Sequence, residues 1–305
     1  MKIAYLMHSD RKYDEVVETI NQLTKQGDHV FIMINDDDLR EQVQFVYMDY
    51  SRVHISHTQE FAQEGDMSMA RGTLIQMKEA VQIGFDYYIN LNDGMMPIKT
   101  REEITAFLEE QNGKDFYYVE TSEKEEPALR KKTLKYYPFT NLLAFPRGKA
   151  TRAITRGFGS LLYALHIRRT LDDVIQIGSP WFMLTHTSAQ ILADNFDYCS
   201  TTFKLSWYAE EMYIPMMLDK FGNKCVEHVN NDYRVVGNGK WERSQNTRPT
   251  TQEAIDRNPE ALFAGAILVD EDFTLYEKYF DIYNANLETE GAVTTKKSHN
   301  AKEMY

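Results

Sequence analysis

Residues 86–100 read DYYINLNDGMMPIKT, a strand pattern that breaks into a polar turn. The first six residues are rich in aromatic and β-branched side chains, which predicts a buried strand over 86–91. Polar Asn92 and Asp93 and the turn-forming Gly94 follow at once. Parallel sheets bind ligands beyond the carboxyl ends of their strands. A buried strand that ends in this way therefore indicates a ligand site.

Strand and helix patterns alternate on both sides of this segment. Short apolar runs predict strands, and apolar residues at steps of three and four predict helices. The expected strands are 2–7, 29–34, 53–55, 86–91 and 116–119, and the expected helices are 14–25, 69–83 and 102–111. Thr100 and Glu103 have the spacing of a capping box ahead of the last helix. This alternation predicts an α/β fold with a mixed, mainly parallel sheet flanked by helices.

Polar residues follow three of these strands and should gather at one edge of the sheet. The three groups are His8-Ser9-Asp10, Asn35-Asp36 and Asn92-Asp93-Gly94. Since the carboxyl ends of parallel strands meet at the same edge, we expect these groups to line one cleft.

The second half of the chain is less regular. Residues 120–160 change from a charged stretch to an aromatic, proline-containing one, which we interpret as an insertion or lid. Helices are then predicted at 161–169, 188–195, 209–221 and 273–284, and strands at 181–185, 224–227 and 232–236. The polar tail, 288–305, is expected to be disordered.

Composition excludes several classes of protein. With 34 Lys and Arg against 46 Asp and Glu, the formal charge is −12. No nucleic-acid partner is expected, because a general binder needs surplus cations to neutralise phosphates. Only Cys199 and Cys225 are present, so the chain is no disulfide scaffold. The first apolar run is too short for a signal peptide and no window reaches the length of a membrane span, so we expect a cytoplasmic protein.

The familiar phosphate and metal motifs are missing. The sequence holds no G-x-x-x-x-G-K-[ST] loop, and GFGS at 157–160 follows no predicted strand, so it is no dinucleotide fingerprint. His54 and His57 could place two imidazoles near a metal, but neither a helix nor a third ligand accompanies them. No metal site is predicted from these residues.

Two adjacent carboxylates, Glu210 and Glu211, open an apolar helix pattern at 209–221. Acidic residues in a first helical turn are commonly explained by the helix dipole alone. A catalytic interpretation requires one of them, Glu211, to point into a pocket as a general base.

Four blocks, in order, resemble the core-2/I-branching enzyme family (glycosyltransferase family 14), which also holds the peptide O-xylosyltransferases. The blocks are 65–74 (GDMSMARGTL), 87–100 (YYINLNDGMMPIKT), 178–185 (GSPWFMLT) and 209–214 (AEEMYI). They resemble, in turn, the family's glycine-serine turn and helix, its strand with an S-G-x-D-x-P-L-K-T turn, its G-S-x-W-F-x-L segment and its P-D-E-x-F/Y motif.

The resemblance implies a glycosyltransferase-A-like fold and an inverting, metal-independent reaction. A sugar (GlcNAc, another hexose or xylose) would pass from a UDP-sugar to a hydroxyl of a glycan or glycoprotein. The family's catalytic Glu falls on Glu211, and one base suffices for inversion. Without a metal, cations must meet the charge of the leaving diphosphate. Residues 234–248 offer Arg234, Lys240, Arg243 and Arg248, while His8, Asn35 and Asp93 would line the nucleotide cleft.

The sequence also departs from the family pattern. The family's turn Asp falls on Met95, with Asp93 two positions earlier, and its diphosphate-binding Lys falls on Ala266. Of the family's two basic diphosphate ligands, only Arg234 has a match. Three explanations stay open: a neighbouring cation replaces the lysine, Mn²⁺ or Mg²⁺ binds at Asp93, or the protein has lost activity.

Acceptor-binding residues follow from the resemblance as well. The family's acceptor Glu and its basic neighbours fall near Glu120, Arg130 and Lys131, although a solvated charged face explains these residues equally. Further candidates for the sugar or acceptor are Trp181, Tyr208 and Glu210. An ordinary core role is the alternative for the tryptophan.

We expect one glycosyltransferase-A-like domain over 1–287, with a nucleotide-binding half at about 1–120 and an acceptor and catalytic half at about 121–287. Animal members carry an N-terminal membrane anchor and luminal disulfides. This sequence shows neither, which suggests a bacterial-type cytoplasmic enzyme, at most peripheral to the inner membrane face. A non-catalytic nucleotide-sugar- or glycan-binding subunit of a transferase complex is the alternative from another class.

Overall fold

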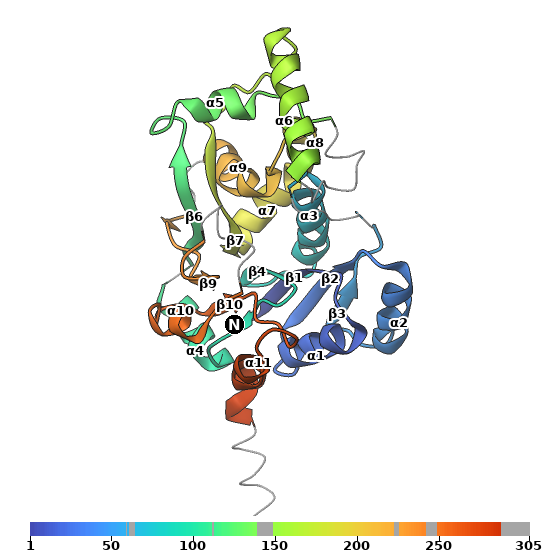
Figure 1. Cartoon of the computed structure of the whole chain (residues 1–305). Helices are drawn as coiled ribbons and strands as arrows, with labels where there is room; N and C mark the ends of the chain where they lie inside the picture. The colour runs from blue at the N-terminus through green and yellow to red at the C-terminus, as the bar shows by residue number, and fades with distance from the viewer. Residues whose placement is uncertain are drawn as a thin grey trace, which may run out of the picture.

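The computed structural model describes residues 1–58, 60, 65–111, 113–138, 149–222, 226–241 and 249–287 (Figure 1). The strands are β1 (Ile3–Ser9), β2 (His29–Ile34), β3 (Val53–Ile55), β4 (Tyr87–Asn92), β5 (Met96–Pro97), β6 (Asp115–Ser122), β7 (Gln176–Thr185), β8 (His228–Val229), β9 (Arg234–Val236) and β10 (Phe263–Gly265). The α-helices are α1 (Tyr13–Thr24), α2 (Asp37–Tyr47), α3 (Ser68–Val81), α4 (Arg101–Glu110), α5 (Ala128–Thr133), α6 (Lys149–Ala164), α7 (His186–Asp194), α8 (Phe196–Thr202), α9 (Tyr213–Phe221), α10 (Gln252–Asp256) and α11 (Phe273–Phe280). Two 3₁₀ turns are η1 (Ala209–Glu211) and η2 (Ile282–Asn284).

A seven-stranded sheet with the order β3-β2-β1-β4-β7-β6-β8 forms the centre of the molecule. The strands β1 to β4 pair in parallel, β7 is antiparallel to both of its neighbours, and β8 is parallel to β6. This topology confirms the predicted α/β fold with a mixed, mainly parallel sheet. The four parallel strands place their carboxyl ends at one edge, as the strand and helix alternation predicted.

Helices cover both faces of the sheet (Figure 1). Alternate residues of β1 belong to different cores: Ala4 and Leu6 pack with α3, α7 and α9, whereas Ile3, Tyr5 and Met7 pack with α1, α2 and α4. Burial on both faces explains why the strand sequences read as continuous apolar runs rather than alternating ones. A third, smaller core joins α10 and α11 to the three-stranded sheet β5-β10-β9.

Several predicted elements differ from the structure in extent or kind. The capping box of Thr100 and Glu103 is present at the start of α4, but α2 was not predicted. Asp36 caps α2, and the exposed Phe45 interrupts its amphipathic pattern. Of the helix expected at 161–169 only 161–164 is helical, as the end of α6, and the helix expected at 209–221 is split into η1 and α9. Part of the strand predicted at 224–227, together with Cys225 and the tail 288–305, lies outside the described residues.

Of the two histidines weighed as metal ligands, His57 is exposed and His54 packs against a different histidine, His29. His54 Nε2 lies 3.0 Å from His29 Nδ1, and its ring stacks on Phe31 at 4.3 Å between centroids. Burial lowers the pKa of His54 to about 4 and also lowers that of His29. In the described part of the chain, no group of three or more His, Cys, Asp or Glu residues could hold a metal ion.

A buried polar network ties the amino end of the sheet together. Asp28, at the start of β2, accepts two hydrogen bonds from the Arg101 guanidinium, at 2.5 and 2.8 Å, and one from the Tyr283 hydroxyl at 2.7 Å. The Tyr283 hydroxyl lies 2.8 Å from that of Tyr5. The last helical turn is thereby connected to the first strand.

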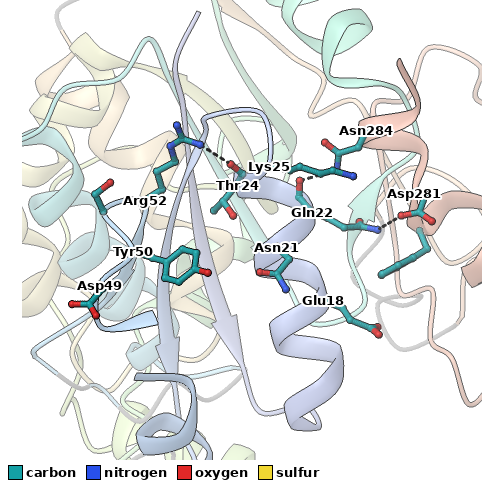
Figure 2. A pocket seen from close by; sticks show the side chains of 12 residues that line it. Glu18, Asn21, Gln22, Thr24, Lys25, Asp49, Tyr50, Arg52, Asp281 and Asn284 are labelled. Carbon is teal, nitrogen blue, oxygen red and sulfur yellow. Dashed lines mark hydrogen bonds between the residues drawn. The ribbon is translucent and has the colours of Figure 1, made fainter. Parts of the chain in front are cut away.

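A surface pocket of about 740 Å³ lies beside this network (Figure 2). It is lined by α1, the turn before β3 and the last helical segments. Figure 2 shows Arg52 donating to the Thr24 carbonyl and Gln22 reaching Asp281 across it. Over the residues that the structure describes, no helix combines the length and apolar character needed to cross a membrane.

Candidate active site

The predicted polar strand ends meet at the carboxyl edge of the sheet. Ser9 Oγ donates to Asp93 Oδ1 at 2.5 Å, and the Asp10 amide donates to Oδ2 at 2.8 Å. The Asn35 amide donates to the Ser9 carbonyl at 3.3 Å. Residues that follow β1, β2 and β4 are therefore joined by hydrogen bonds, which confirms that they share one edge.

Asp93 is held in an environment that disfavours its charge. Burial, and after it a hydrogen bond with the Asp10 side chain, raise its pKa from 3.8 to about 7 against the lowering effect of Ser9. Carboxyls with such a shift are frequent at functional sites, although structural networks also produce them.

A cavity of about 180 Å³ opens beside Asp93. Its walls come from the ends of β4, β9 and β10, the middle of β7, the first turn of α3, and η1. The lining residues are Met69, Asn92, Asp93, Met95, Pro180, Trp181, Glu210, Glu211, Val236, Gly265 and Ala266. Four residues predicted for the site from the sequence, Asp93, Trp181, Glu210 and Glu211, thus line one cavity.

The turn around Gly94 brings the end of β10 to this cavity. Gly94 has φ +74°, and a Cβ there would lie 2.5 Å from Leu268 Cδ2 and 3.3 Å from Ala266 Cβ. Its carbonyl accepts from the Ile267 amide at 2.8 Å. Glycine is favoured at this position because other residues rarely adopt this positive φ, and a Cβ would also crowd Ala266.

Two carboxylates enter the cavity from η1. The preceding Tyr208 has φ +59°, and its amide donates to the Gly65 carbonyl at 2.8 Å. In return, the Gly65 amide donates to Glu210 Oε1 at 2.7 Å. These two bonds fix the 208–211 turn against the loop before α3, so both carboxylates are held at the wall. Glu210 and Glu211 are 7 % and 2 % exposed, so each charge is largely removed from solvent.

Arg234 is close to the cavity but does not line it. Its guanidinium donates to the carbonyls of Asn90 at 2.8 Å and Phe182 at 3.1 Å, which belong to β4 and β7. It also lies over the ring of Trp181, 5.7 Å from the centroid. Burial lowers the pKa of Arg234 to about 10, partly offset by Asp232. These contacts make it a support for the tryptophan and the sheet.

None of the other cations predicted for the diphosphate is seen at the cavity among the described residues. Lys240 is exposed, and Arg243 and Arg248 lie outside the described residues. The residues that flank them are held beside the cavity: the Thr250 amide donates to the Ala266 carbonyl at 2.9 Å, and Thr250 Oγ accepts from the Gly237 amide at 3.1 Å. No Lys or Arg occurs among the described residues that line the cavity.

His8 faces the core instead of the cavity. Its Nε2 lies 3.0 Å from Thr73 Oγ1, and its ring fills the space over Gly72, where a Cβ would come within 2.5 Å of Cε1. Burial lowers its pKa to about 4, which keeps the ring neutral. Asn35 is half-buried and contributes the amide contact described above.

The residues predicted for the acceptor are dispersed. Glu120 is exposed and lines a separate hollow of about 460 Å³. Arg130 is paired with Glu123 at 2.8 Å and donates to the Leu171 carbonyl, and Lys131 is exposed. Tyr208 stacks on Trp207, with centroids 5.7 Å apart. None of these four predicted residues lines the 180 Å³ cavity.

Sequence reasoning missed Met69, Val236 and the contact of Gly65 with Glu210. Met69 follows Ser68 within the glycine-serine block, at the start of α3. The predicted start of that helix could have indicated Met69 as a residue of the site. Nothing local in the sequence pairs Gly65 with Glu210, because the two are separated by 145 positions.

Two adjacent buried carboxylates at the carboxyl end of a mainly parallel sheet are the geometry of an enzyme site for a polar ligand. The family described as Core-2/I-Branching enzyme matches residues 3–262 of this chain. The chain belongs to the core-2/I-branching enzyme family. It is therefore a glycosyltransferase, and its fold is α/β with a mixed, mainly parallel sheet, as the sequence predicted.

Other comparisons are more distant. No curated protein matches this chain. Among solved structures, 4-diphosphocytidyl-2C-methyl-D-erythritolsynthase from Anaerococcus prevotii is 13 % identical with a TM-score of 0.36, over 84 % of this chain and 93 % of that one. Mannose-1-phosphate geranyltransferase from Thermus thermophilus is 12 % identical with a TM-score of 0.30, over 74 % and 72 %.

Proposed function

We propose that this protein is an inverting, metal-independent glycosyltransferase with Glu211 as its general base. It transfers GlcNAc, another hexose or xylose from a UDP-sugar to a hydroxyl of a glycan or glycoprotein. The observation that carries the proposal is the pair of buried carboxylates on the wall of the cavity at the end of β4. An acceptor hydroxyl that enters this cavity meets a base in a site from which most water is excluded.

The choice of Glu211 over Glu210 follows the resemblance to the family's motif, and Glu210 has a structural contact that gives it another role. Glu210 Oε1 already accepts from the Gly65 amide, which gives this carboxylate a part in holding the loop. The family's catalytic Glu falls on Glu211 in the Ala209–Glu211 block. Glu210 would then orient the acceptor beside the base.

The proposed reaction balances in one displacement. The acceptor oxygen attacks the anomeric carbon from the face opposite the diphosphate, and the bond between that carbon and the diphosphate oxygen breaks. Glu211 takes the hydroxyl proton, and UDP leaves with the bonding electron pair. Trp181, on the cavity wall, offers an apolar ring face to the sugar.

Cations from the segment after β9 would meet the charge of the leaving UDP. Support comes from Thr250 and Gly237, whose mutual contact and bond to Ala266 hold this segment's ends beside the cavity. Lys240 and Arg243 are the cations we assign to the diphosphate, with Arg248 as a third. Arg234 would act indirectly, by supporting Trp181.

A metal ion bound by Asp93 is the rival mechanism, because Asp93 lines the same cavity. Both of its oxygens accept hydrogen bonds, from Ser9 and from the Asp10 amide. Its raised pKa also leaves it partly neutral near pH 7, which weakens a carboxylate as a metal ligand.

The test is UDP release from a panel of UDP-sugars, with and without candidate acceptors, in the presence and absence of EDTA. We expect EDTA-resistant release that Glu211→Gln lowers by about 10²–10⁴-fold while UDP binding persists, the range that a general base contributes. Glu253→Gln, which changes an exposed carboxylate, is the matched control. Release that EDTA abolishes and Mn²⁺ restores would establish the rival instead.

Two further variants separate the assigned roles. Lys240→Ala and Arg243→Ala should raise the KM for the donor, because each removes a positive charge from the diphosphate. Turnover that is unchanged in Glu211→Gln but lost in Glu210→Gln would move the base to the neighbouring residue.

A further inference from the structure

A helix with an exposed apolar face lies at the end of the molecule farthest from α11 (Figure 1). This helix is α6, and the apolar face comprises Ile154 and Leu161 on the helix and Leu165 directly after it, which are 61 %, 54 % and 61 % exposed. At 100° per residue, the three positions fall within a narrow arc. Ile167, just after the helix, is 49 % exposed and extends the apolar surface.

The opposite side of α6 is attached to the body of the protein. A Cβ at Gly159 would lie 2.9 Å from the Tyr136 carbonyl, so the helix packs there without a side chain. Arg156 lies over the Trp207 ring, 5.3 Å from its centroid, and Lys135 donates to Ser160 at 2.8 Å. The apolar face therefore points to solvent, because the opposite side of the helix packs against the body of the protein.

The charge around α6 is opposite to that of the whole chain. Residues 128–171 hold ten Lys and Arg and no Asp or Glu, in a protein with a formal charge of −12. Neighbouring acidic residues neutralise two of these cations, since Glu123 pairs with Arg130 and Glu126 with Lys132. Lys131 and Arg168 remain exposed.

We propose that α6 and its basic neighbours form a docking surface for an anionic lipid bilayer. An amphipathic helix with an apolar face and surrounding cations binds in the interface of a membrane, where apolar side chains enter the acyl boundary and cations meet lipid phosphates. A neutral partner would not explain exposed cations such as Lys131 and Arg168 beside the apolar face, and a soluble anion would not explain the leucines. This surface is separate from the cavity, and the proposal does not depend on the identity of the base.

The test is flotation of the full-length protein with phosphatidylcholine vesicles that contain or lack phosphatidylglycerol. We expect binding to the anionic vesicles only, weakened by salt. The double variant Leu161→Asp, Leu165→Asp should bind about tenfold more weakly or worse, because two leucines no longer enter the bilayer. Both side chains are exposed, so the fold should survive, which an unchanged thermal unfolding curve would verify.

The matched control is Phe45→Asp, Met48→Asp on and just after α2, where the side chains are 76 % and 70 % exposed but lie in an acidic stretch. It should bind vesicles as the wild type does. For the cations, Arg168→Glu should weaken binding while Arg257→Glu, beside Glu253, should not.

Three outcomes would overturn the proposal. The first is wild-type protein that ignores anionic vesicles, and the second is equal loss of binding in the α6 and α2 double variants. The third is vesicle-independent self-association that Leu161→Asp, Leu165→Asp abolishes, which would make this face an interface between two copies. The readout is binding alone, so it remains informative whether or not UDP release is found.

Discussion

The two ends of the central sheet each have a hollow, and the larger one is the less promising. At the amino end, the pocket of about 740 Å³ in Figure 2 is lined largely by solvent-exposed groups such as Asn21, Lys25 and Asp49. At the carboxyl end, a cavity of about 180 Å³ is lined by the buried Glu210 and Glu211. Desolvated ionisable groups, and not volume, mark the site where chemistry can occur.

Both ends also contain an aspartate held by hydrogen bonds, and the partners distinguish the roles of the two. Asp28 is fully buried and accepts from the Arg101 guanidinium, the Tyr283 hydroxyl and the Ile3 amide. Every one of these partners is part of the scaffold. Asp93, by contrast, lines the cavity and has a pKa raised to about 7. The amino end should therefore control stability, and the carboxyl end should control turnover.

The largest effect is expected from Arg101→Ala. It leaves the fully buried Asp28 without its guanidinium partner, which costs about 3–5 kcal/mol when a buried pair is broken from one side. Turnover per folded molecule should stay unchanged. Urea unfolding followed by circular dichroism measures the loss. Lys12→Ala, which breaks the exposed pair with Asp270, is the control and should hardly change the unfolding curve.

Asp93→Asn should change how stability depends on pH. The pKa of Asp93 is raised in the fold from 3.8 to about 7, so between these values the folded state binds more protons than the unfolded state. Its contribution to stability is thus fully present below about pH 4 and is lost as the pH rises through about 7. The variant should lack this part of the decline. Denaturation midpoints at a series of pH values check this; parallel curves for variant and wild type would contradict it.

Asp115 gives a useful reference for that experiment. Burial raises the pKa of Asp115 to about 6. The contribution of Asp115 to stability is therefore also lost as the pH rises, but over a lower pH range than that of Asp93. It accepts from the Thr185 amide and Ser188 at the start of α7, away from the carboxyl end of β4. The slope that remains in Asp93→Asn should therefore end at a lower pH than the slope of the wild type.

Ala266→Lys should increase UDP affinity at the carboxyl end of the sheet, because it adds the cation that the family pattern has at this position. Ala266 lines the cavity, so a lysine there would strengthen UDP binding by about tenfold through a charge-assisted bond. Isothermal titration with UDP measures the change. A lysine that leaves UDP affinity unchanged would show that the diphosphate binds elsewhere.

The smallest effect is expected from Lys25→Gln combined with Asp49→Asn in the amino-end pocket. Both residues are exposed at its rim, so UDP release should change by less than about twofold, as surface substitutions rarely affect the fold. A steady-state rate measurement suffices. A large loss of turnover would mean that the pocket in Figure 2 takes part in catalysis.

Much of the fold was predictable because local patterns determine it. The apolar runs of β1, β2 and β4 and the capping box of α4 are signals within a few residues, and each predicted its element. The helix α2 was missed because exposed Phe45 and Val46 obscure its apolar face. The separation of η1 from α9 falls at Met212, which has φ −116°, and no propensity indicates a break there.

The candidate site was predictable only in part. Asp93 and Glu211 were found from a strand end and a motif, and both line the cavity. Arg234 was predicted for the diphosphate from local charge and from its match to a basic ligand of the family, but its guanidinium donates to backbone carbonyls of β4 and β7. Acceptor residues in the 120–135 stretch could not be predicted reliably. The apolar residues of that stretch show no regular spacing, and its alignment with the family is loose.

The hydrogen bond between Ser9 and Asp93 has a consequence for the order of folding. It joins positions 84 residues apart, and the cavity also needs η1 and Ala266 from much later in the chain. Contacts of such high sequence separation form late, since a long loop must close before they can be made. On refolding, helical signal should therefore return before UDP binding does. During synthesis, a nascent chain that stops before residue 266 has no complete cavity.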